Sequence, residues 1–102
     1  MKLSIVVPAY QAASTLSDVV ERVPAELWPD IEHFLVIDDG SRDATSEIVR
    51  SLGGIHPQIE LLAHPRNLGY GATVRDGLLA ARNWNSDATI CLHADGQYPP
   101  ER

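Results

Sequence analysis

Short apolar runs alternate with amphipathic stretches along the chain. Runs rich in Val, Ile and Leu, each bounded by turn-forming residues, predict buried strands at 3–7, 31–37, 59–63 and 88–92. Between them, apolar residues recur at helical spacing and predict helices over 14–23, 43–52 and 72–83. The connections are too long for hairpins, so we expect parallel strands with helices on both faces. The predicted fold class is α/β, a Rossmann-like three-layer α/β/α arrangement with a mainly parallel sheet in β-α-β-α-β-α-β order.

Capping residues and apolar spacing predict the helix boundaries and the buried helix faces. Pro8 is expected to end the first strand, and Ser14 and Asp43 are expected to cap the first two helices. Gly53-Gly54 is expected to end the second helix. The residues predicted to face the core are Leu16, Val19, Val20 and Val23, then Ala44, Ile48, Val49 and Leu52, then Val74, Leu78 and Ala81.

Two residues in these segments carry packing expectations of their own. Gly77 lies inside the third predicted helix, where glycine costs about 1 kcal/mol relative to alanine, so it is expected to permit close packing. Trp28, in the connection after the first helix, is expected to pack against that helix. Cys91 is the single cysteine and lies in an apolar run, which predicts a reduced core residue without a disulfide framework and favours a cytoplasmic setting.

Composition and charge narrow the class of partner. The chain has 102 residues, of which 44% are hydrophobic and 22% charged, which is typical of one soluble globular unit. A net charge of −6 disfavours a nucleic-acid or anionic membrane surface, so any bound phosphate is expected to be held locally. No run approaches the roughly 20 apolar residues of a membrane helix, and the N-terminus does not resemble a signal peptide. Because the sequence stops directly after a polar loop, we expect it to be a fragment.

Polar clusters follow three of the predicted strands: Pro8-Ala9-Tyr10, Asp38-Asp39-Gly40 and His93-Ala94-Asp95. The carboxyl ends of parallel strands meet at one edge of a sheet, where ligands of such folds bind. Tyr10 there is either a stacking partner for a nucleobase or a half-buried packing residue. Asp39 is either a hydrogen-bond acceptor for a base or a turn carboxylate, with Asp38 supporting the turn.

A divalent metal is the expected cofactor at the last of these clusters. Asp95 is placed to bridge Mg²⁺ or Mn²⁺ to a diphosphate, because hard cations take carboxylate and phosphate oxygens together. His93 lies two residues earlier, on the same side of an extended chain, and is either a further metal ligand or a phosphate hydrogen-bond donor.

Several motifs are absent from the sequence. It has no Gly-x-x-x-x-Gly-Lys-Ser/Thr loop and no Gly-x-Gly-x-x-Gly after the first strand, so neither phosphate-loop hydrolysis nor dinucleotide redox chemistry is supported. The remaining histidines, His33, His56 and His64, are too scattered to be assigned a role. A nucleotidyltransferase, a phospho-receiver module and a non-catalytic nucleotide-binding module remain alternatives.

Four ordered segments resemble the N-terminal half of the family 2 glycosyltransferases of the GT-A fold, particularly the branch of dolichol-phosphate mannose synthase and other polyprenyl-phosphate sugar transferases. The segments are Val6-Val7-Pro8-Ala9-Tyr10, Ile37-Asp38-Asp39-Gly40-Ser41-Arg42-Asp43-Ala44-Thr45, Asn67-Leu68-Gly69-Tyr70-Gly71-Ala72 with Gly77, and His93-Ala94-Asp95-Gly96-Gln97-Tyr98-Pro99-Pro100-Glu101. The resemblance implies that 1–102 is the nucleotide-sugar-binding part of a transferase whose acceptor half and catalytic base lie beyond it.

The resemblance also implies residue roles in donor binding. Pro8, Ala9 and Tyr10 are expected to line the base and ribose, and Asp39 is expected to pair with the base. Asp95 is expected to hold the metal on the diphosphate. The other residues expected at the donor site are Asp38, Asn67, Gly71, Ala94 and Gln97.

Two residues depart from the family pattern. Gln11 replaces the usual asparagine, which affects a loop hydrogen bond, and His93 replaces the first aspartate of an Asp-x-Asp motif, which leaves Asp95 as the main metal ligand.

The resemblance implies partners as well. They are a UDP- or GDP-sugar donor and, in the intact protein, a polyprenyl phosphate or glycan acceptor at the cytoplasmic face of the membrane. No nucleic-acid partner is expected. Self-association is expected through an exposed sheet edge, because unpaired strand edges accept further strands.

Overall fold

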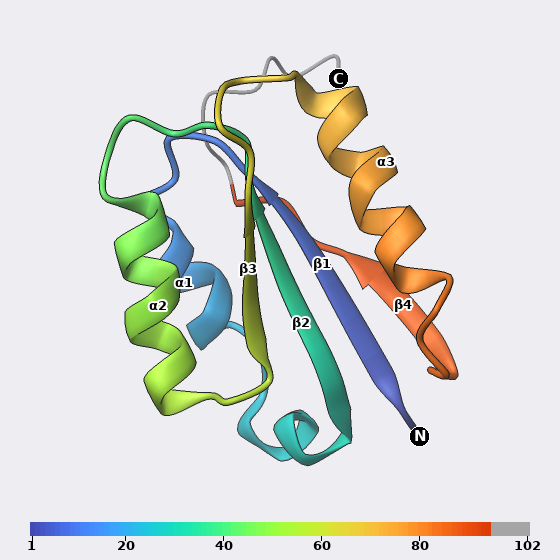
Figure 1. The fold of residues 1–102 in the computed structure, drawn as a ribbon. Helices are drawn as coiled ribbons and strands as arrows, with labels where there is room; N and C mark the ends of the chain where they lie inside the picture. The colour runs from blue at the N-terminus through green and yellow to red at the C-terminus, as the bar shows by residue number, and fades with distance from the viewer. Residues whose placement is uncertain (95–102) are drawn as a thin grey trace.

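The structure is a computed structural model that describes residues 1–94 (Figure 1). Its elements in chain order are β1 (Leu3–Ala9), α1 (Leu16–Glu21), the 3-10 helix η1 (Ala25–Asp30), β2 (Ile31–Asp38), α2 (Thr45–Ile55), β3 (Ile59–Ala63), α3 (Tyr70–Ala81) and β4 (Ala88–Cys91). All strands and helices predicted from the sequence are present, and the α/β fold class is confirmed.

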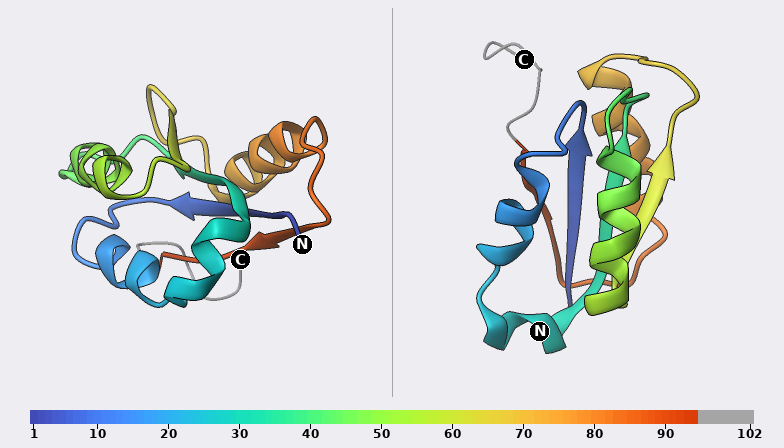
Figure 2. Two further views of the ribbon diagram at one scale, coloured as in Figure 1. Left: turned by 90° about the horizontal axis from the view of Figure 1, so that it is seen from below. Right: turned by 90° about the vertical axis from the view of Figure 1, so that its left-hand side faces the viewer.

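The described strands form one parallel sheet in the order β3-β2-β1-β4. The chain moves outward from β1 through β2 to β3, then returns across the sheet to place β4 on the other side of β1. Helices α1 and α2 therefore cover one face and α3 covers the other (Figures 1 and 2). The order reverses at β1, and ligands of such folds bind near this reversal, beyond the carboxyl ends of the strands. Strands β3 and β4 are the edges of the described sheet, and self-association through an edge stays a prediction.

Alternate residues of the central strands face opposite sides of the sheet. Ile5, Val7, Phe34 and Val36 join the larger apolar cluster, which includes buried residues of α1 and α2. Val6, Leu35 and Ile37 form a smaller cluster on the α3 side, packed against Ala80 and Trp84. Complete burial on both faces explains why β1 and β2 read as continuous apolar runs.

Helix α3 meets the sheet through a different face from the predicted one. Its buried residues are Thr73 and Gly77, whereas Leu78 is 58% exposed, so the predicted face of Val74, Leu78 and Ala81 is wrong. A Cβ atom on Gly77 would lie 2.4 Å from Val6 Cγ1, so only glycine fits the observed approach. The prediction of close packing at Gly77 is confirmed, and small residues, not large apolar ones, make this contact.

Strand β1 continues through Pro8 to Ala9, so the prediction that it ends at Pro8 is wrong. The Val6 carbonyl accepts a hydrogen bond from Leu92, so Pro8, two residues further on, also presents its backbone toward the β4 side. The paired residues of β1 and β4 end at Val6 and Cys91. The ring nitrogen of Pro8, which carries no hydrogen, therefore lies beyond the β1–β4 ladder, and its lack of an N–H costs no hydrogen bond to β2.

Helix boundaries differ from the predictions by a few residues. Ser14 does not cap α1, whose N-cap is Thr15. Asp43 does not cap α2, whose N-cap is Ala44, although Asp43 Oδ1 accepts the Thr45 N–H at 3.0 Å. Helix α2 continues through Gly53-Gly54 to Ile55, and α3 begins at Tyr70, two residues earlier than predicted.

The faces predicted for the first two helices are mostly confirmed. In α1, Leu16, Val19 and Val20 are buried, and Val23 packs against the core just after the helix. In α2, Val49 is buried and Ile48 and Leu52 pack against the core, but Ala44 is exposed and precedes the helix.

Trp28 lies in the same core cluster as Leu16, Val19 and Val20 of α1, as expected. Trp28 stacks on His56, with ring centroids 3.8 Å apart, and on Phe34 at 5.4 Å. Cys91 is exposed, so its prediction as a core residue is wrong. It pairs with Val6 in register and so faces the α3 side of β4, an edge strand that the described residues leave partly uncovered.

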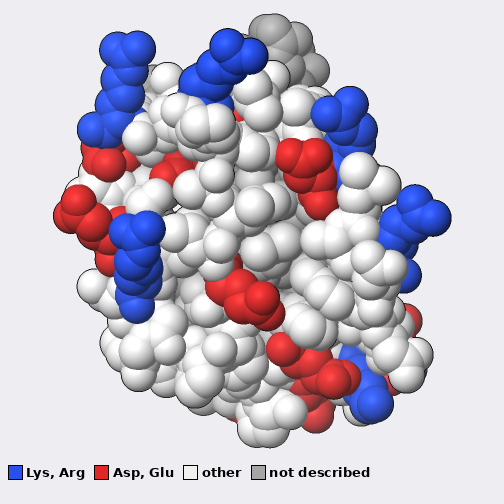
Figure 3. All heavy atoms as spheres, in the orientation of Figure 1, with Lys and Arg blue, Asp and Glu red and all other residues white. Residues whose placement is uncertain are grey.

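The described surface is mixed in charge. On the face shown in Figure 3, Lys and Arg side chains lie apart from one another, with acidic groups among them, and form no continuous basic stripe. Among residues 1–94, no helix has the length and apolar character needed to cross a membrane.

Candidate functional site

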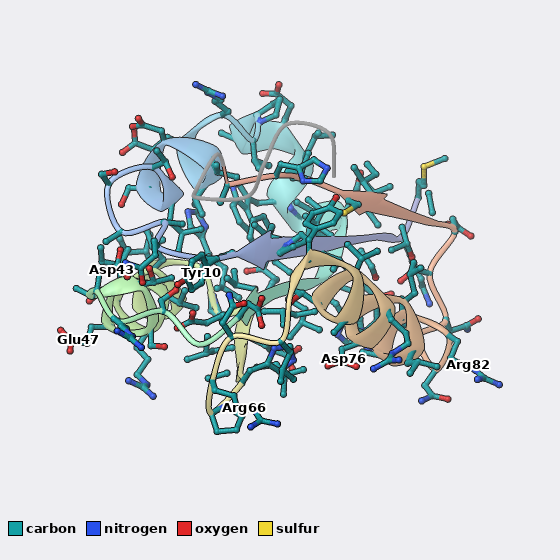
Figure 4. All side chains as sticks on the ribbon, turned by 90° about the horizontal axis from the view of Figure 1, so that it is seen from above. Tyr10, Asp43, Glu47, Arg66, Asp76 and Arg82 are labelled. Carbon is teal, nitrogen blue, oxygen red and sulfur yellow. The ribbon has the colours of Figure 1, made fainter. Side chains whose placement is uncertain are left out.

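The loops that follow β1, β2 and β3 enclose a polar pocket of about 320 Å³ at the carboxyl edge of the sheet. This volume lies at the lower end of the range for small-molecule sites. Figure 4 looks onto this edge and shows Tyr10 and Arg66 on its loops, with Asp76 projecting from α3. The residues that line the pocket are Tyr10, Asp38, Gly40, Ser41, Arg42, Ser46, Ala63, His64, Pro65, Arg66 and Asn67. Of the predicted donor-site residues, Tyr10, Asp38 and Asn67 are therefore brought together.

Asp38 supports the turn after β2, as the sequence predicted. Its Oδ1 accepts the Ser41 N–H at 2.9 Å, and its Oδ2 accepts a hydrogen bond from the Ser46 hydroxyl of α2. The side chain is only 3% exposed. These bonds fix the turn against the first turn of α2.

Asp39 lies beneath the pocket and is completely buried. Its Oδ1 accepts the Leu68 N–H at 2.8 Å, and its Oδ2 accepts the Gly69 N–H at 2.9 Å. The Asn67 side-chain amide donates to Oδ2 at 3.2 Å. The carboxylate thus holds the segment between β3 and α3 through both of its oxygens.

His64 also lines the pocket, although the sequence analysis assigned it no role. Its ring is 7% exposed and lies between two carboxylates, with Nδ1 2.8 Å from Asp39 Oδ1 and Nε2 2.7 Å from Asp76 Oδ2. The signal was in the strand pairing, because Asp38 lies opposite Ala63 and the next residues are therefore neighbours. Pairing the second and third predicted strands side by side would have placed His64 beside Asp39.

Hydrogen bonds shift the pKa values of this pair in opposite directions. Burial alone would raise the pKa of Asp39, but the bonds from His64, Leu68 and Gly69 outweigh it and lower the pKa. Burial alone would lower the pKa of His64, but the bonds to Asp39 and Asp76 outweigh it and raise the pKa. Both shifts favour an imidazolium between two carboxylates.

The loop after β1 is tied to the acidic turn through Gln11. The Gln11 N–H donates to Ser41 Oγ at 2.8 Å, and its side-chain Oε1 accepts the Arg42 N–H at 2.6 Å. Gln11 has φ of 52°, a left-handed conformation in which asparagine is more common. Gln11 thus makes loop hydrogen bonds although it replaces the asparagine usual in the family, and these bonds hold the adjacent Tyr10 at the pocket.

Gly40 brings the acidic turn against the segment after β3. Its φ is +72°, and a Cβ atom there would lie 2.2 Å from the Arg66 carbonyl carbon and 2.4 Å from Asn67 N. Only a residue without a side chain permits two backbones to approach so closely. The two sides of the pocket are thus in direct contact at its base.

The other predicted donor-site residues lie outside this pocket or outside the described chain. Pro8 and Ala9 are buried within β1, and Ala94 is buried with its carbonyl accepting from Thr15 Oγ1 at 3.4 Å. Gly71 lies exposed in the first turn of α3. Gln97 lies outside the described residues.

The predicted metal ligands lie at the end of β4. His93 is exposed and its ring stacks on Tyr70, with centroids 5.5 Å apart and the Tyr70 hydroxyl 3.2 Å from Nε2. Asp95 lies outside the described residues. Among residues 1–94, no three His, Cys, Asp or Glu side chains are grouped so as to hold a metal ion. The described residues alone therefore do not make a metal centre.

Solved structures share this fold. The structure of S. aureus TarS 1-349 in complex with UDP-GlcNAc has a TM-score of 0.71 at 20% identity, over 93% of this chain and 27% of that one. Mannosyltransferase PcManGT from Pyrobaculum calidifontis in complex with GDP-Man and Mn²⁺ has a TM-score of 0.65 at 21% identity, over 92% of this chain and 27% of that one. These likenesses confirm the expected GT-A-type fold.

Sequence comparison identifies the family. A dolichyl-phosphate beta-glucosyltransferase of Trichomonas vaginalis is 35% identical in an alignment 100 residues long, which covers 91% of this chain and 29% of that relative. The chain thus spans less than a third of the relative's length. The family Glycosyl transferase family 2 matches residues 4–102, nearly the whole chain. The chain therefore belongs to glycosyl transferase family 2.

Proposed function

We propose that the chain is the donor-binding part of a glycosyltransferase that moves a sugar from a UDP- or GDP-sugar to an acceptor. The observation that carries the proposal is the pocket at the carboxyl edge of the sheet, built from three loops of a family 2 glycosyltransferase chain. Family membership favours this function over a nucleotidyltransferase or a phospho-receiver module. The donor complexes of TarS with UDP-GlcNAc and of PcManGT with GDP-Man support a nucleotide sugar as the ligand class.

Tyr10 is proposed to stack on the base at the mouth of the pocket. It lines the pocket, and an aromatic ring there offers a flat apolar face to a heterocycle. Asp39 contributes by fixing the Asn67–Gly69 segment, because its oxygens already accept bonds from that segment. Direct pairing of Asp39 with a base would require one of these donors to move aside. Asn67 and the Arg66 backbone form the opposite wall.

A divalent cation, Mg²⁺ or Mn²⁺, is proposed at Asp95, with His93 as a further ligand. The Mn²⁺ in the PcManGT complex supports a metal in the same fold. When bound, such an ion supplies a Lewis acid that stabilises the departing diphosphate. The stacking of Tyr70 on His93 holds the imidazole in one orientation.

The acceptor and the cellular setting are proposed from the relatives. The name of the Trichomonas relative gives dolichyl phosphate as its acceptor, which supports a polyprenyl phosphate here. Such an acceptor lies in a membrane, so the proposed location in a longer protein is the cytoplasmic face of a membrane. The base that deprotonates the acceptor is proposed to lie beyond residue 102, so these 102 residues alone should show no sugar transfer.

Isothermal titration calorimetry with UDP and GDP, each with and without Mn²⁺, tests the proposal. We expect one nucleotide to bind only with Mn²⁺, binding to be lost in Asp95→Ala, and affinity to fall in Tyr10→Ala. The control is Asp30→Ala, which removes an exposed carboxylate just before β2, at the opposite end of that strand from the pocket. Binding of neither nucleotide, or equal binding in Asp95→Ala and the unmodified chain, would contradict the proposal.

A further inference from the structure

A buried histidine connects the pocket to α3. The ring of His64, just after β3, reaches Asp39 at the end of β2 through Nδ1 and Asp76 of α3 through Nε2. Asp39 is fully buried, and the Asp76 side chain is 30% exposed. One side chain therefore joins the ends of β2 and β3, where the pocket lies, to α3.

Both ring nitrogens of His64 must act as donors. An ionised carboxylate only accepts hydrogen bonds, whereas a neutral imidazole has one N–H and one lone pair. With oxygens 2.8 Å from Nδ1 and 2.7 Å from Nε2, a neutral ring would direct its lone pair at a carboxylate oxygen. With both carboxylates ionised, this geometry favours a doubly protonated ring, in agreement with the raised pKa of His64.

The other charged and polar groups near the ring come from β2, from α3 and from the loop of His64 itself. From β2, the Asp38 carboxylate is directed to Ser41 and Ser46. The main-chain carbonyl of Asp38 accepts the main-chain N–H of His64 at 2.8 Å. From α3, Arg75 lies behind Asp76, with Nε 4.0 Å from Oδ1 and an exposed side chain. From the loop of His64 itself, Arg66 lies at the pocket lining. The charged groups that contact the ring are the carboxylates of Asp39 and Asp76.

The bonds of Asp39 extend this connection to the pocket wall. The same carboxylate that accepts from His64 also accepts from the side-chain amide of Asn67, which lines the pocket, at 3.2 Å. It accepts from the Leu68 and Gly69 N–H groups directly after Asn67 as well. The Gly69 carbonyl in turn accepts from Thr73 Oγ1 at 2.9 Å, in the first turn of α3. Movement of Asp39 would therefore release the wall and the start of the helix together.

We propose that His64 is a positioning residue for donor binding, because its ring, bonded at both nitrogens, fixes Asp39 and with it Asn67 of the pocket wall and the Leu68 and Gly69 backbone that follows. Nucleotide affinity then decreases when the ring loses one of its two N–H donors. The inference rests on the proposed function, since it takes a nucleotide as the ligand of the pocket. It assigns His64 no contact with the reacting atoms.

Two substitutions separate the two bonds of the ring. His64→Asn retains an N–H near the position of Nδ1 and so the bond to Asp39, and His64→Gln retains one near Nε2 and so the bond to Asp76. The matched control is His33→Gln, because His33 also meets a carboxylate, with Nδ1 3.3 Å from Glu60 Oε1, but lies near the start of β2.

Calorimetric affinity for UDP and GDP with Mn²⁺ should fall about tenfold or more in each His64 variant, the factor expected for losing a charged hydrogen bond, and not in His33→Gln. The amide protection factors of Leu68 and Gly69 should fall in the same variants without nucleotide. The protection factors of Val7 and Val36 report whether the sheet is intact.

A pH series on the unmodified chain provides a test without substitution. Nitrogen NMR shifts of the His64 ring give its titration directly. Nucleotide affinity and the protection of Leu68 and Gly69 should both decrease as pH rises through that titration, with His64→Gln as the baseline for the nucleotide's own phosphate. Unchanged affinity in both His64 variants, or an affinity that does not follow the ring titration, would overturn the inference while leaving the proposed function in place. If the unmodified chain binds neither nucleotide, the proposed function fails and this inference fails with it.

Discussion

Substitution of Asp39 by asparagine should be among the most destabilising changes in the chain. The carboxylate accepts the Leu68 N–H at 2.8 Å, the Gly69 N–H at 2.9 Å and the His64 Nδ1–H at 2.8 Å, and it has no exposed surface. An amide of the same shape has one oxygen, and its NH₂ group would face donors on the other side. At least one buried N–H would therefore lose its acceptor, and the imidazolium would lose one of its two counter-charges.

The expected cost follows from those losses. A buried donor left without a partner costs about 1–3 kcal/mol, and removal of one partner of a buried ion pair costs about 3–5 kcal/mol. These terms overlap, so we expect Asp39→Asn to lower the free energy of unfolding by about 3–5 kcal/mol. That is a large share of the roughly 5–15 kcal/mol that stabilises a typical domain.

Urea denaturation followed by tryptophan fluorescence measures this change, since Trp28 is buried against Phe34 and His56. The matched control is Asp43→Asn. Asp43 is exposed and accepts the Thr45 N–H at 3.0 Å just before α2, and an asparagine there keeps one oxygen to accept that bond. Its effect should stay below about 1 kcal/mol. If Asp39→Asn costs no more than Asp43→Asn, the buried hydrogen bonds of Asp39 do not stabilise the fold as argued.

Three further predictions concern pH and two glycines. Because folding raises the pKa of His64 above 6.5, the protonated ring stabilises the fold fully below that pH, and this stabilisation is lost as pH rises through the folded-state pKa. Urea midpoints measured across pH should show this loss, and His64→Gln should lack it. Gly77→Ala should destabilise by about 1–3 kcal/mol despite its higher helix propensity, because its Cβ meets Val6; a thermal midpoint at or above that of the unmodified chain would contradict this. Gly40→Ala should cost about 2 kcal/mol or more and weaken nucleotide binding, because its Cβ meets the Arg66 backbone; unchanged amide shifts at Arg66 would contradict this.

The sequence was sufficient for the strands and for the face of α1, because continuous apolar runs and helical spacing depend on local composition. It was misleading for α3, where Leu78 and Val74 have the spacing of a buried face but Thr73 and Gly77 meet the sheet. Apolar spacing identifies large hydrophobic residues, whereas the distance between a helix and a sheet depends on where small residues permit approach. The distance between α3 and the sheet depends on both packed surfaces, and Gly77 was the only sign of it in the sequence.

The candidate site was predictable to a similar extent. Strand ends located Tyr10, Asp38 and Asp39 at one edge, because parallel strands bring their carboxyl ends together. His64 was not recognised, because its partners are 25 and 12 residues away and an isolated histidine carries no pattern. The burial of the Asp39 carboxylate also depends on hydrogen bonds from the Leu68 and Gly69 main-chain N–H groups, and main-chain positions cannot be inferred from residue types.

The approach of α3 to β1 at Gly77 means that residue volume on one side of the sheet bears on the pocket at its edge. Gly77 touches Val6 and directly follows Asp76, which holds His64. The combined volume at positions 6 and 77 therefore sets how far α3 stands from the sheet, and with it the reach from Asp76 to His64. A larger residue at 77 should be accommodated only with a smaller one at 6. The two positions therefore form one steric unit, although they are far apart in sequence and lie away from the pocket.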